Sequence, residues 1–523
     1  VGTQALLYND GGYQNTAVGT ASLASNTSGV RNVAIGCGAA YSNTSGHCNV
    51  AIGCQASYSN QTGRENVAVG SKALYSSTVG ENVAVGSCAA TANTSGTQNT
   101  ALGHKALCSN TIGTCNVAIG FNTLINSVTA CGNVAVGNYA LCSNTCGEKN
   151  VAVGNYALAS NTEAWYNVAI GHCTLNANTT GEYNVGIGRQ PLNFNTTGTM
   201  NVAIGRQALY QNTDGHCNTA VGTYALNANT EGDFNQAFGH SALYGNKTGH
   251  YNSAIGCGSL QQANSGDHNN AVGLGTLFSN WGGSGNQAIG RQALACNTTG
   301  SCNEAMGYRA LYLNRTGCFN VALGPWSLYS ANSGCNNFAG GQCALYNNWG
   351  GTGNAAIGSQ ALCTNTTGSY NAGIGMNALL ANTTGEFNNA MGCAALNSNT
   401  TGSSNAALGN AALATNTTGS NNTAIGYNAL RLAISGDDNF AAGQCALYNN
   451  WGGCDNTAIG QKALYTNTTG CNNVAIGANA LCKNTTAQNN QAIGANAMLN
   501  NTTGQYNAAI GRYTLADNTD GDY

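Results

Sequence analysis

The chain has 523 residues, with 73 Gly, 2 Pro, only 6% charged residues and a formal net charge of -3. Nucleic acids and anionic membranes are bound by clustered Lys and Arg, and the sequence has no such cluster, so we expect neither partner. Apolar runs are only a few residues long, far below the roughly 20 that cross a bilayer, so we expect no membrane insertion.

One seventeen-residue pattern, N-x-A-(I/V)-G-x-x-A-L-x-x-N-T-T-G-x-x, runs through the chain. Thirty units begin with its leading Asn, from Asn15 to Asn507, and residues 1–14 are a partial unit in the same register. The only slip is a sixteen-residue unit that ends before Asn82. We number positions in each unit from the leading Asn, which is position one.

A period of seventeen is too short for helix-pair repeats and fits one coil of a parallel β-solenoid. We therefore predict an all-β fold, a single-chain parallel β-solenoid (β-roll) that continues over residues 1–523 in about 31 coils. Each coil is expected to hold two short strands, "NVAIG" and "ALYxN", which carry the apolar and branched residues that strands favour. The Gly at position five and the "NTTG" segment supply the bends. Neighbouring coils then stack about 4.8 Å apart.

Stacking places equal positions of successive coils on top of each other. Position one is Asn in all thirty units, and position twelve is Asn in most, so we predict two ladders of hydrogen-bonded amides along the solenoid. The exceptions at position twelve are Ser77, Ser127, Ala263, Ala331 and Ala433. Many position-twelve Asn also lie in N-x-S/T sequons, and glycosylation is the alternative to a buried ladder there.

The side chain at position two divides the chain into two regions. It is Val in ten of the twelve units over residues 15–217, whereas residues 218–523 carry mixed residues such as Gln236, Asn270 and Glu304. Because position four is also apolar, we infer that this side of the strand is covered by the opposite wall of the coil or by another chain. Our hypothesis is a lateral interface in the first region, and drift on an exposed strand is the alternative. The candidate interface residues are Val33, Val50, Val67, Val83, Val117, Val134, Val151, Val168, Val185 and Val202.

Three units replace "NTTG" by "NWGG", at Trp281, Trp349 and Trp451, and the unit before each has Ala at position twelve. A small residue next to a bulky one indicates packing compensation. Sugar binding is the alternative, since stacked Trp can bind sugars, although these Trp are four and six coils apart.

The 23 Cys are many for a cytosolic chain. Three pairs occupy one position in adjacent coils, at a spacing that allows disulfides, which would indicate an oxidising exterior. Cys outside these pairs could bridge chains, and scattered free thiols are the alternative. The candidate inter-coil disulfides join Cys37 to Cys54, Cys318 to Cys335, and Cys454 to Cys471.

No pattern of catalytic or ligand-binding residues stands out. The seven His lie mostly coils apart, and no Ser-His-Asp set, phosphate loop or carboxylate pair is recognisable. We therefore predict no enzymatic activity, no cofactor and no metal site.

The run "NVAIG", followed by two variable residues, Ala and a Gly-ended turn, resembles the head repeats of trimeric autotransporter adhesins. The longer "NTAIGxxALxxNTTG" is similar to repeats of phage and giant-virus fibre proteins. The resemblance covers essentially the whole chain, and it implies a left-handed β-roll on a surface appendage that is often trimeric.

We therefore expect an extracellular structural protein on a cell or virion surface, a fibre or filament subunit whose rod is extended end to end and stapled by disulfides. Its expected partner is a further copy of itself, head to tail, with lateral or trimeric association as the additional modes. The first alternative is an adhesin or virion fibre shaft that presents a binding tip, and the second is an ice-binding solenoid. The chain starts at Val1 without a signal peptide or a recognisable cap, so flanking domains are missing or the ends pair with further copies.

Overall fold

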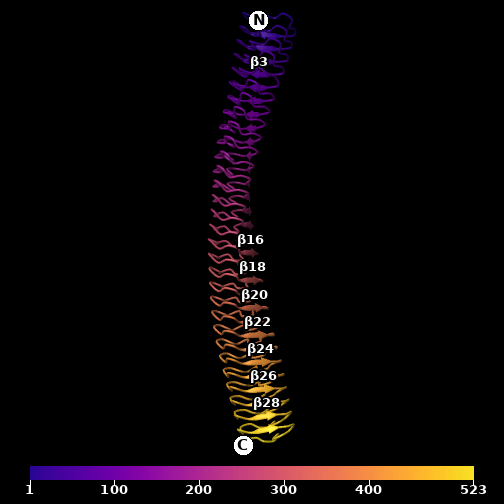
Figure 1. Ribbon diagram of the computed structural model, residues 1–523, viewed down its shortest axis with the longest axis vertical. Helices are drawn as coiled ribbons and strands as arrows, with labels where there is room; N and C mark the ends of the chain where they lie inside the picture. The colour runs from indigo at the N-terminus through magenta and orange to yellow at the C-terminus, as the bar shows by residue number, and fades with distance from the viewer. Residues whose placement is uncertain (523) are drawn as a thin grey trace. The chain divides into compact units, whose positions relative to one another are not determined.

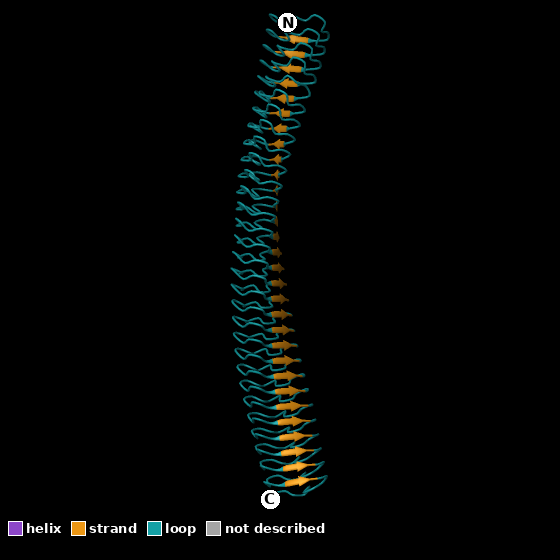
Figure 2. Ribbon diagram, in the orientation of Figure 1, coloured by secondary structure: helices purple, strands orange, loops and turns teal. Residues whose placement is uncertain are grey.

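The computed structural model describes residues 1–522 as an all-β protein. Within these residues there are 30 strands of three residues each and no helix (Figures 1 and 2). Each strand occupies positions two to four of one repeat, so the predicted parallel β-solenoid with one coil per repeat is confirmed. The chain forms two compact units, Val1–Ser265 and Gly266–Tyr523. We describe each unit by itself.

In the first unit neighbouring strands, from β1 to β15, pair in parallel and in register. Val202, Ala203 and Ile204 of β12, for example, lie against Thr219, Ala220 and Val221 of β13. Partners are seventeen residues apart except at the sixteen-residue unit, where Val67 pairs with Val83. The strands are β1 (Thr16–Val18), β2 (Val33–Ile35), β3 (Val50–Ile52), β4 (Val67–Val69), β5 (Val83–Val85), β6 (Thr100–Leu102), β7 (Val117–Ile119), β8 (Val134–Val136), β9 (Val151–Val153), β10 (Val168–Ile170), β11 (Val185–Ile187), β12 (Val202–Ile204), β13 (Thr219–Val221), β14 (Gln236–Phe238) and β15 (Ser253–Ile255).

The second unit repeats this architecture. Asn389 and Met391 of β23, for example, pair with Ala406 and Leu408 of β24. The strands are β16 (Asn270–Val272), β17 (Gln287–Ile289), β18 (Glu304–Met306), β19 (Val321–Leu323), β20 (Phe338–Gly340), β21 (Ala355–Ile357), β22 (Ala372–Ile374), β23 (Asn389–Met391), β24 (Ala406–Leu408), β25 (Thr423–Ile425), β26 (Phe440–Ala442), β27 (Thr457–Ile459), β28 (Val474–Ile476), β29 (Gln491–Ile493) and β30 (Ala508–Ile510).

The prediction of a second strand in each coil is wrong. Positions six to eleven form turns, because the residues at positions seven and nine have left-handed backbone conformations, with φ of 52° at Gln207 and 50° at Leu209. This segment nevertheless bonds to both neighbouring coils. Gln207 N donates to Arg189 O of the preceding coil at 3.0 Å, and Leu209 N donates to Ala225 O of the next coil at 3.0 Å. The backbone groups are therefore paired as they would be in a strand.

The two recurring glycines have different roles. Gly205 at position five has φ of 129°, and a Cβ there would lie 2.7 Å from the carbonyl oxygen of Gly222 in the next coil. Position five is Gly in all thirty units, because both the conformation and the close approach exclude a side chain. Position fifteen does not have a positive φ, and Ala130 and Ala164 occupy it in the buried interior.

Both predicted Asn ladders are present. At position one, Asn201 Nδ2 donates to Asn184 Oδ1 of the preceding coil at 3.2 Å and to Gly215 O of its own coil at 2.8 Å. At position twelve, Asn212 Nδ2 donates to Asn195 Oδ1 at 2.7 Å and to the same Gly215 O at 3.0 Å. The two ladders therefore converge on one carbonyl and fix the turn over positions twelve to fifteen. The Asn side chains of both ladders are almost entirely buried.

Alanine at position twelve breaks the ladder and leaves a buried acceptor without a donor. Ala331 follows Asn314 by one coil, and Ala433 follows Asn416; the Oδ1 atoms of both Asn have no hydrogen-bond partner. Buried polar groups are nearly always paired, so each break costs stability, about 1–3 kcal/mol per unpaired group.

The core of each coil is small and repetitive. Ala203, Ala208 and Leu209, at positions three, eight and nine, are fully buried. Position nine is Leu in most coils, and its exceptions are Ala40, Ser57, Ala90 and Met498. No β-branched residue occurs there, because a left-handed backbone is strongly unfavourable for such side chains.

Candidate interaction surface

The strand of each coil has one buried and one outward side. In β12, Ala203 is 0% exposed, whereas Ile204 is 37% exposed and Val202 is half-buried. Successive side chains of a strand point to opposite sides, so positions two and four share the outward side in every coil. We call the surface formed by positions two and four the outer strand face.

The ten valines that we predicted as a lateral interface all lie on the outer strand face of the first unit. Nine of them are half-buried and Val83 is 37% exposed. They stack on one another through the strand register, as Val168 does on Val185. The opposite wall of the coil does not cover them in the described residues. Covering by another chain stays a prediction, and drift on an exposed strand stays its alternative.

Position four adds a second apolar row, which our interface prediction did not include. Ile35, Ile170 and Ile187 are 38%, 40% and 37% exposed. The signal was present in the sequence, since position four is apolar in nearly every unit. We had assigned it to a covered layer, but the structure leaves it open.

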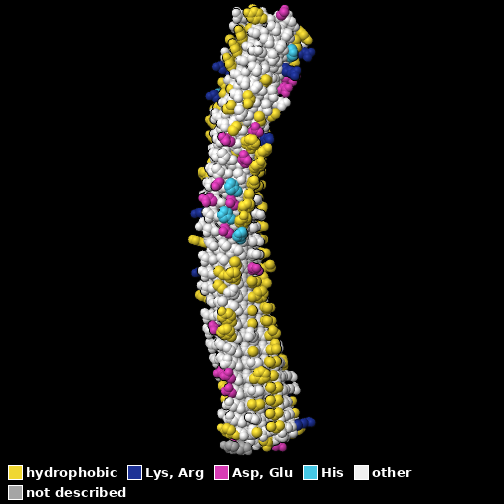
Figure 3. All heavy atoms as spheres, viewed as in Figure 1, with side chains coloured by type: hydrophobic (Ala, Val, Ile, Leu, Met, Phe, Trp, Pro, Cys, Tyr) yellow, Lys and Arg dark blue, Asp and Glu magenta, His cyan; other side chains and the backbone are white. Residues whose placement is uncertain are grey.

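In the second unit the outer strand face is apolar at position four and more polar at position two. Asn270, Gln287 and Glu304 are exposed at position two. Figure 3 shows a column of hydrophobic side chains over the strands of this unit. The Val-rich region and the mixed region therefore differ on this face, as their sequences indicated.

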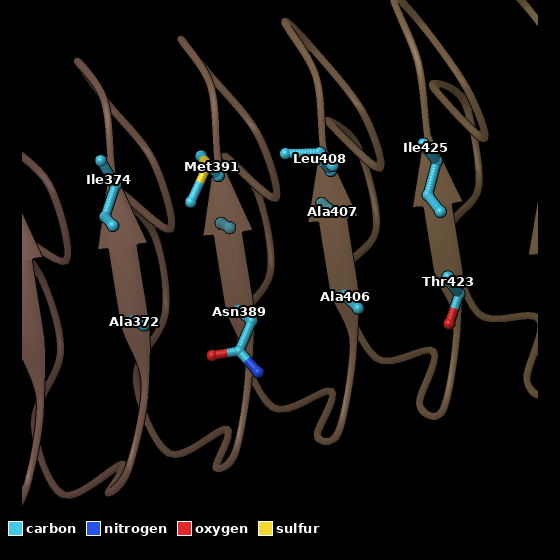
Figure 4. Close-up of a pocket in the computed structure, with 10 residues that line it drawn as sticks. Ala372, Ile374, Asn389, Met391, Ala406, Ala407, Leu408, Thr423 and Ile425 are labelled. Carbon is cyan, nitrogen blue, oxygen red and sulfur yellow. The ribbon is translucent and has the colours of Figure 1, made fainter. Parts of the chain in front are cut away.

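A shallow apolar hollow of about 370 Å³ lies on the outer strand face over β22–β25. Figure 4 shows its two rows, one of large side chains at position four and one of smaller side chains at position two. The hollow forms because Ala and Thr replace Val at position two while position four stays large. The first row contains Ile374, Met391, Leu408 and Ile425, and the second contains Ala372, Asn389, Ala406 and Thr423.

Two coils exchange the sizes of these positions. Phe338 precedes Gly340 on β20, and Phe440 precedes Ala442 on β26. A Cβ on Gly340 would lie 3.3 Å from Cε1 of Phe338, so the ring lies over the glycine and fills the space of the missing side chain. The outer strand face therefore stays apolar in both coils.

The six cysteines of the predicted disulfides are free thiols in this structure. Cys37 and Cys54 are exposed at position six of adjacent coils. The other two pairs lie at position sixteen, where the backbone amide of one Cys donates to the sulfur of the next, at 3.2 Å from Cys318 to Cys335 and at 3.1 Å from Cys454 to Cys471. Their disulfides remain predictions.

Position sixteen forms a third ladder, which we did not predict. The amide of Thr199 donates to Nδ1 of His216 at 3.0 Å, and the amide of Ser403 donates to Oγ of Ser420 at 3.1 Å. Cys at this position is therefore one of several side chains, with Ser, Asp and His, that accept a hydrogen bond from the backbone amide of the preceding coil. Burial raises the pKa of the Cys454 thiol, and a hydrogen bond from the Asp437 backbone opposes that shift.

The titratable residues outside these ladders are spread along the coils that the structure describes. Within residues 1–522, no three His, Cys, Asp or Glu side chains are arranged to hold a metal ion. The same residues include no helix that is long and apolar enough to span a membrane. Ion-pair contacts occur between His216 and Asp214, at 3.8 Å, and between His250 and Asp233, at 3.6 Å.

The outer strand face is therefore our candidate for a surface that binds a partner. No model of a known protein family matches the sequence, and no curated protein matches it at a significant level.

Proposed function

We propose that this chain is the structural shaft of a fibre or filament on the exterior of a cell or virion, and that copies associate laterally through the outer strand face. The observation that carries the proposal is the apolar surface of the outer strand face, which position four maintains in both units and position two extends over the Val-rich region. Soluble monomers rarely expose contiguous apolar patches of more than a few hundred Å².

The size of the outer strand face supports an interface with a second copy. With position-four side chains about 40% exposed, as at Ile170, we take roughly 70 Å² of open apolar surface per coil. The strands of either unit then present on the order of 1,000 Å², more than the ~800 Å² that each partner buries in a typical interface. The face carries few charges, which suits burial, because burying unpaired charges is costly.

Axial stacking is the second contact that we propose. The backbone groups of each coil bond to the coils before and after it, as Val202 N does to Asn218 O at 2.8 Å. A coil without a neighbour on one side would present these groups to another chain, as the edge of any sheet does. Exposed thiols such as Cys37 and Cys54 could then staple the assembly in an oxidising medium.

The test is a charge placed on the outer strand face. Ile170→Lys with Ile187→Lys puts two ammonium groups on adjacent coils, and the matched control puts Lys at Thr180 and Thr197 in the turns of the same coils. Sedimentation velocity should show an oligomer for the native chain and the control, and a monomer with an unchanged circular dichroism spectrum for the first variant. A native chain that is monomeric at 100 times the working concentration would remove the lateral interface.

The second candidate is an adhesin or virion fibre shaft that presents a binding tip. The same apolar face supports it, because three shafts packed around an axis would bury one face each. A trimer in the sedimentation experiment favours this candidate, and open-ended growth favours the filament.

The ice-binding alternative gains no support from the "NTT" turns. Thr213 Oγ1 donates to Thr230 O of the next coil at 3.1 Å, and Thr196 Oγ1 donates to Thr213 O at 3.0 Å. These hydroxyls are therefore engaged within the protein. Thermal hysteresis of the purified chain would revive the alternative.

A further inference from the structure

The Trp residues of the "NWGG" turns point outward. Trp349 is 61% exposed, although Ala331 in the preceding coil is fully buried. Most of the indole ring therefore lies outside the space that becomes free when Ala replaces Asn in the preceding coil. Packing compensation, which we predicted for these turns, does not account for an exposed ring of this size, because exposing a large apolar group to water is unfavourable.

A hollow of about 190 Å³ lies beside this ring. Trp349 and Leu313 provide its apolar walls, and Arg315, Ser330 and Asn332 provide its polar lining. Arg315, Asn332 and Trp349 occupy position thirteen of three successive coils, so the hollow spans two coil steps along the solenoid. This size suits one small ring, since pockets for larger ligands enclose about 300–1,000 Å³.

The polar side chains of the hollow are available to a ligand. Within the described residues, the side chains of Arg315, Ser330 and Asn332 form no hydrogen bond and no ion pair. The backbone of these coils is satisfied separately, since Arg315 N donates to Asn332 O at 3.1 Å. A guanidinium, an amide and a hydroxyl therefore converge on a space that has an aromatic wall.

We infer that this hollow binds a single acidic sugar ring carried on a glycan or polysaccharide. The face of Trp349 suits the apolar C–H face of a pyranose. Arg315 offers the fork of N–H donors that pairs with a carboxylate, and Asn332 and Ser330 suit the ring hydroxyls. The site goes beyond the structural role proposed above and does not depend on lateral association.

The chain contains its own comparison site. The coil at residues 439–455 repeats the "NWGG" turn with Trp451, which is 54% exposed. At the positions equivalent to Arg315 and Asn332 it has Thr417 and Ile434, and Thr417 Oγ1 already donates to Ile434 O at 2.9 Å. The aromatic wall is thus kept, while the free polar groups are absent.

The experiment is saturation-transfer NMR on the full chain with methyl β-D-glucuronide and, as the uncharged probe, methyl β-D-glucoside. We expect the native chain to bind the glucuronide at least tenfold more tightly than the glucoside. Trp349→Ala should weaken glucuronide binding at least tenfold, Arg315→Gln should bring the preference for the glucuronide close to one, and Trp451→Ala should change neither.

A gain-of-function variant makes the test independent of loss of folding. Thr417→Arg with Leu432→Ser and Ile434→Asn gives the turn of Trp451 the three polar side chains that line the hollow at Trp349, and should double the number of glucuronide sites. Absence of binding by the native chain, or binding that Trp349→Ala and Arg315→Gln leave unchanged, would overturn the assignment. Stronger binding of benzoate than of glucuronide would overturn it as well, in favour of an aromatic acid. A chain that loses self-association but still binds the glucuronide would separate this site from the proposed shaft function.

Discussion

Replacing Asn212 by Ala in the middle of a position-twelve ladder should open the solenoid locally. The side chain of Asn212 takes part in three hydrogen bonds: to Asn195 Oδ1 at 2.7 Å, to Gly215 O at 3.0 Å, and from Asn229 Nδ2 at 2.7 Å. After the substitution Gly215 O keeps its bond from Asn201, and Asn229 keeps its bond to Gly232 O. Asn195 Oδ1 becomes a buried acceptor without a donor, and one N–H of Asn229 Nδ2 loses its acceptor.

The magnitude follows from these contacts. Three hydrogen bonds contribute about 1 kcal/mol each, and one unpaired buried acceptor adds a penalty of the same order, so we expect a loss of about 3–4 kcal/mol. The acceptor is the same kind of group that Ala331 already leaves unpaired at Asn314. The loss should stay local, because a coil of a solenoid contacts only its neighbours.

Hydrogen exchange measured by mass spectrometry on the full chain is the suitable assay. A loss of about 3 kcal/mol lowers amide protection in residues 201–217 roughly a hundredfold. Gln211→Ala, which removes an exposed side chain at the neighbouring position, should leave protection unchanged. Equal protection in the Asn212→Ala variant and the native chain would show that the buried amide ladder does not stabilise the coils.

Three further substitutions test other parts of the coil. Ala331→Asn should restore the broken ladder and raise the unfolding free energy of the second unit by about 1–2 kcal/mol, which urea unfolding would show as a higher midpoint. A lower midpoint would contradict the cost that we assign to the unpaired Asn314 oxygen. Gly205→Ala should unfold the coils around it, as circular dichroism would show. Gly215→Ala should cost less, because the backbone there has no positive φ and Ala130 and Ala164 occupy the same position, although the new Cβ must move away from Gly232 O, which would lie 2.6 Å from it; equal effects would refute the different roles of the two glycines. Leu209→Ile should cost about 2 kcal/mol more than Leu209→Met in urea unfolding, because a β-branched residue strains the left-handed backbone; equal costs would refute that reason.

The period of the sequence was sufficient to predict the fold. Once equal positions stack, the parallel register, the buried Ala at position three and the two Asn ladders follow. The glycine at position five was predictable for the same reason, since every coil needs the bend and the close approach of the next carbonyl oxygen. Even the sixteen-residue unit behaves as expected, because Val67 and Val83 stay in register across it.

Composition did not predict the path of the second half of the coil. The run "ALYxN" has the residues that strands favour. The left-handed backbone at positions seven and nine results from how the coil closes, and its clearest sign in the sequence is the absence of β-branched residues at position nine. The acceptor row at position sixteen was missed for a related reason. Ser, Asp, His and Cys are chemically different residues. They share a role only in the folded coil, where each accepts a hydrogen bond from the position-sixteen amide of the preceding coil.

The candidate surface was predicted in part. The valines at position two lie on the outward side of the strand, which a lateral interface requires, while the interface itself stays a prediction. From the sequence, covering of positions two and four by the opposite wall of the coil was an equal possibility. Burial of Ile204 depends on which segments pack against its strand. The repeat sequence indicates a partner chain only through the residue types on the outward side of the strand.

A cryo-electron microscopy map of the purified chain, at a resolution that separates strands, tests the central claim most directly. The account predicts one rung of density about every 4.8 Å within each unit, with one seventeen-residue repeat per rung and a second copy against positions two and four. Rungs that hold two repeats, or an outer strand face that is bare in every particle, would contradict it.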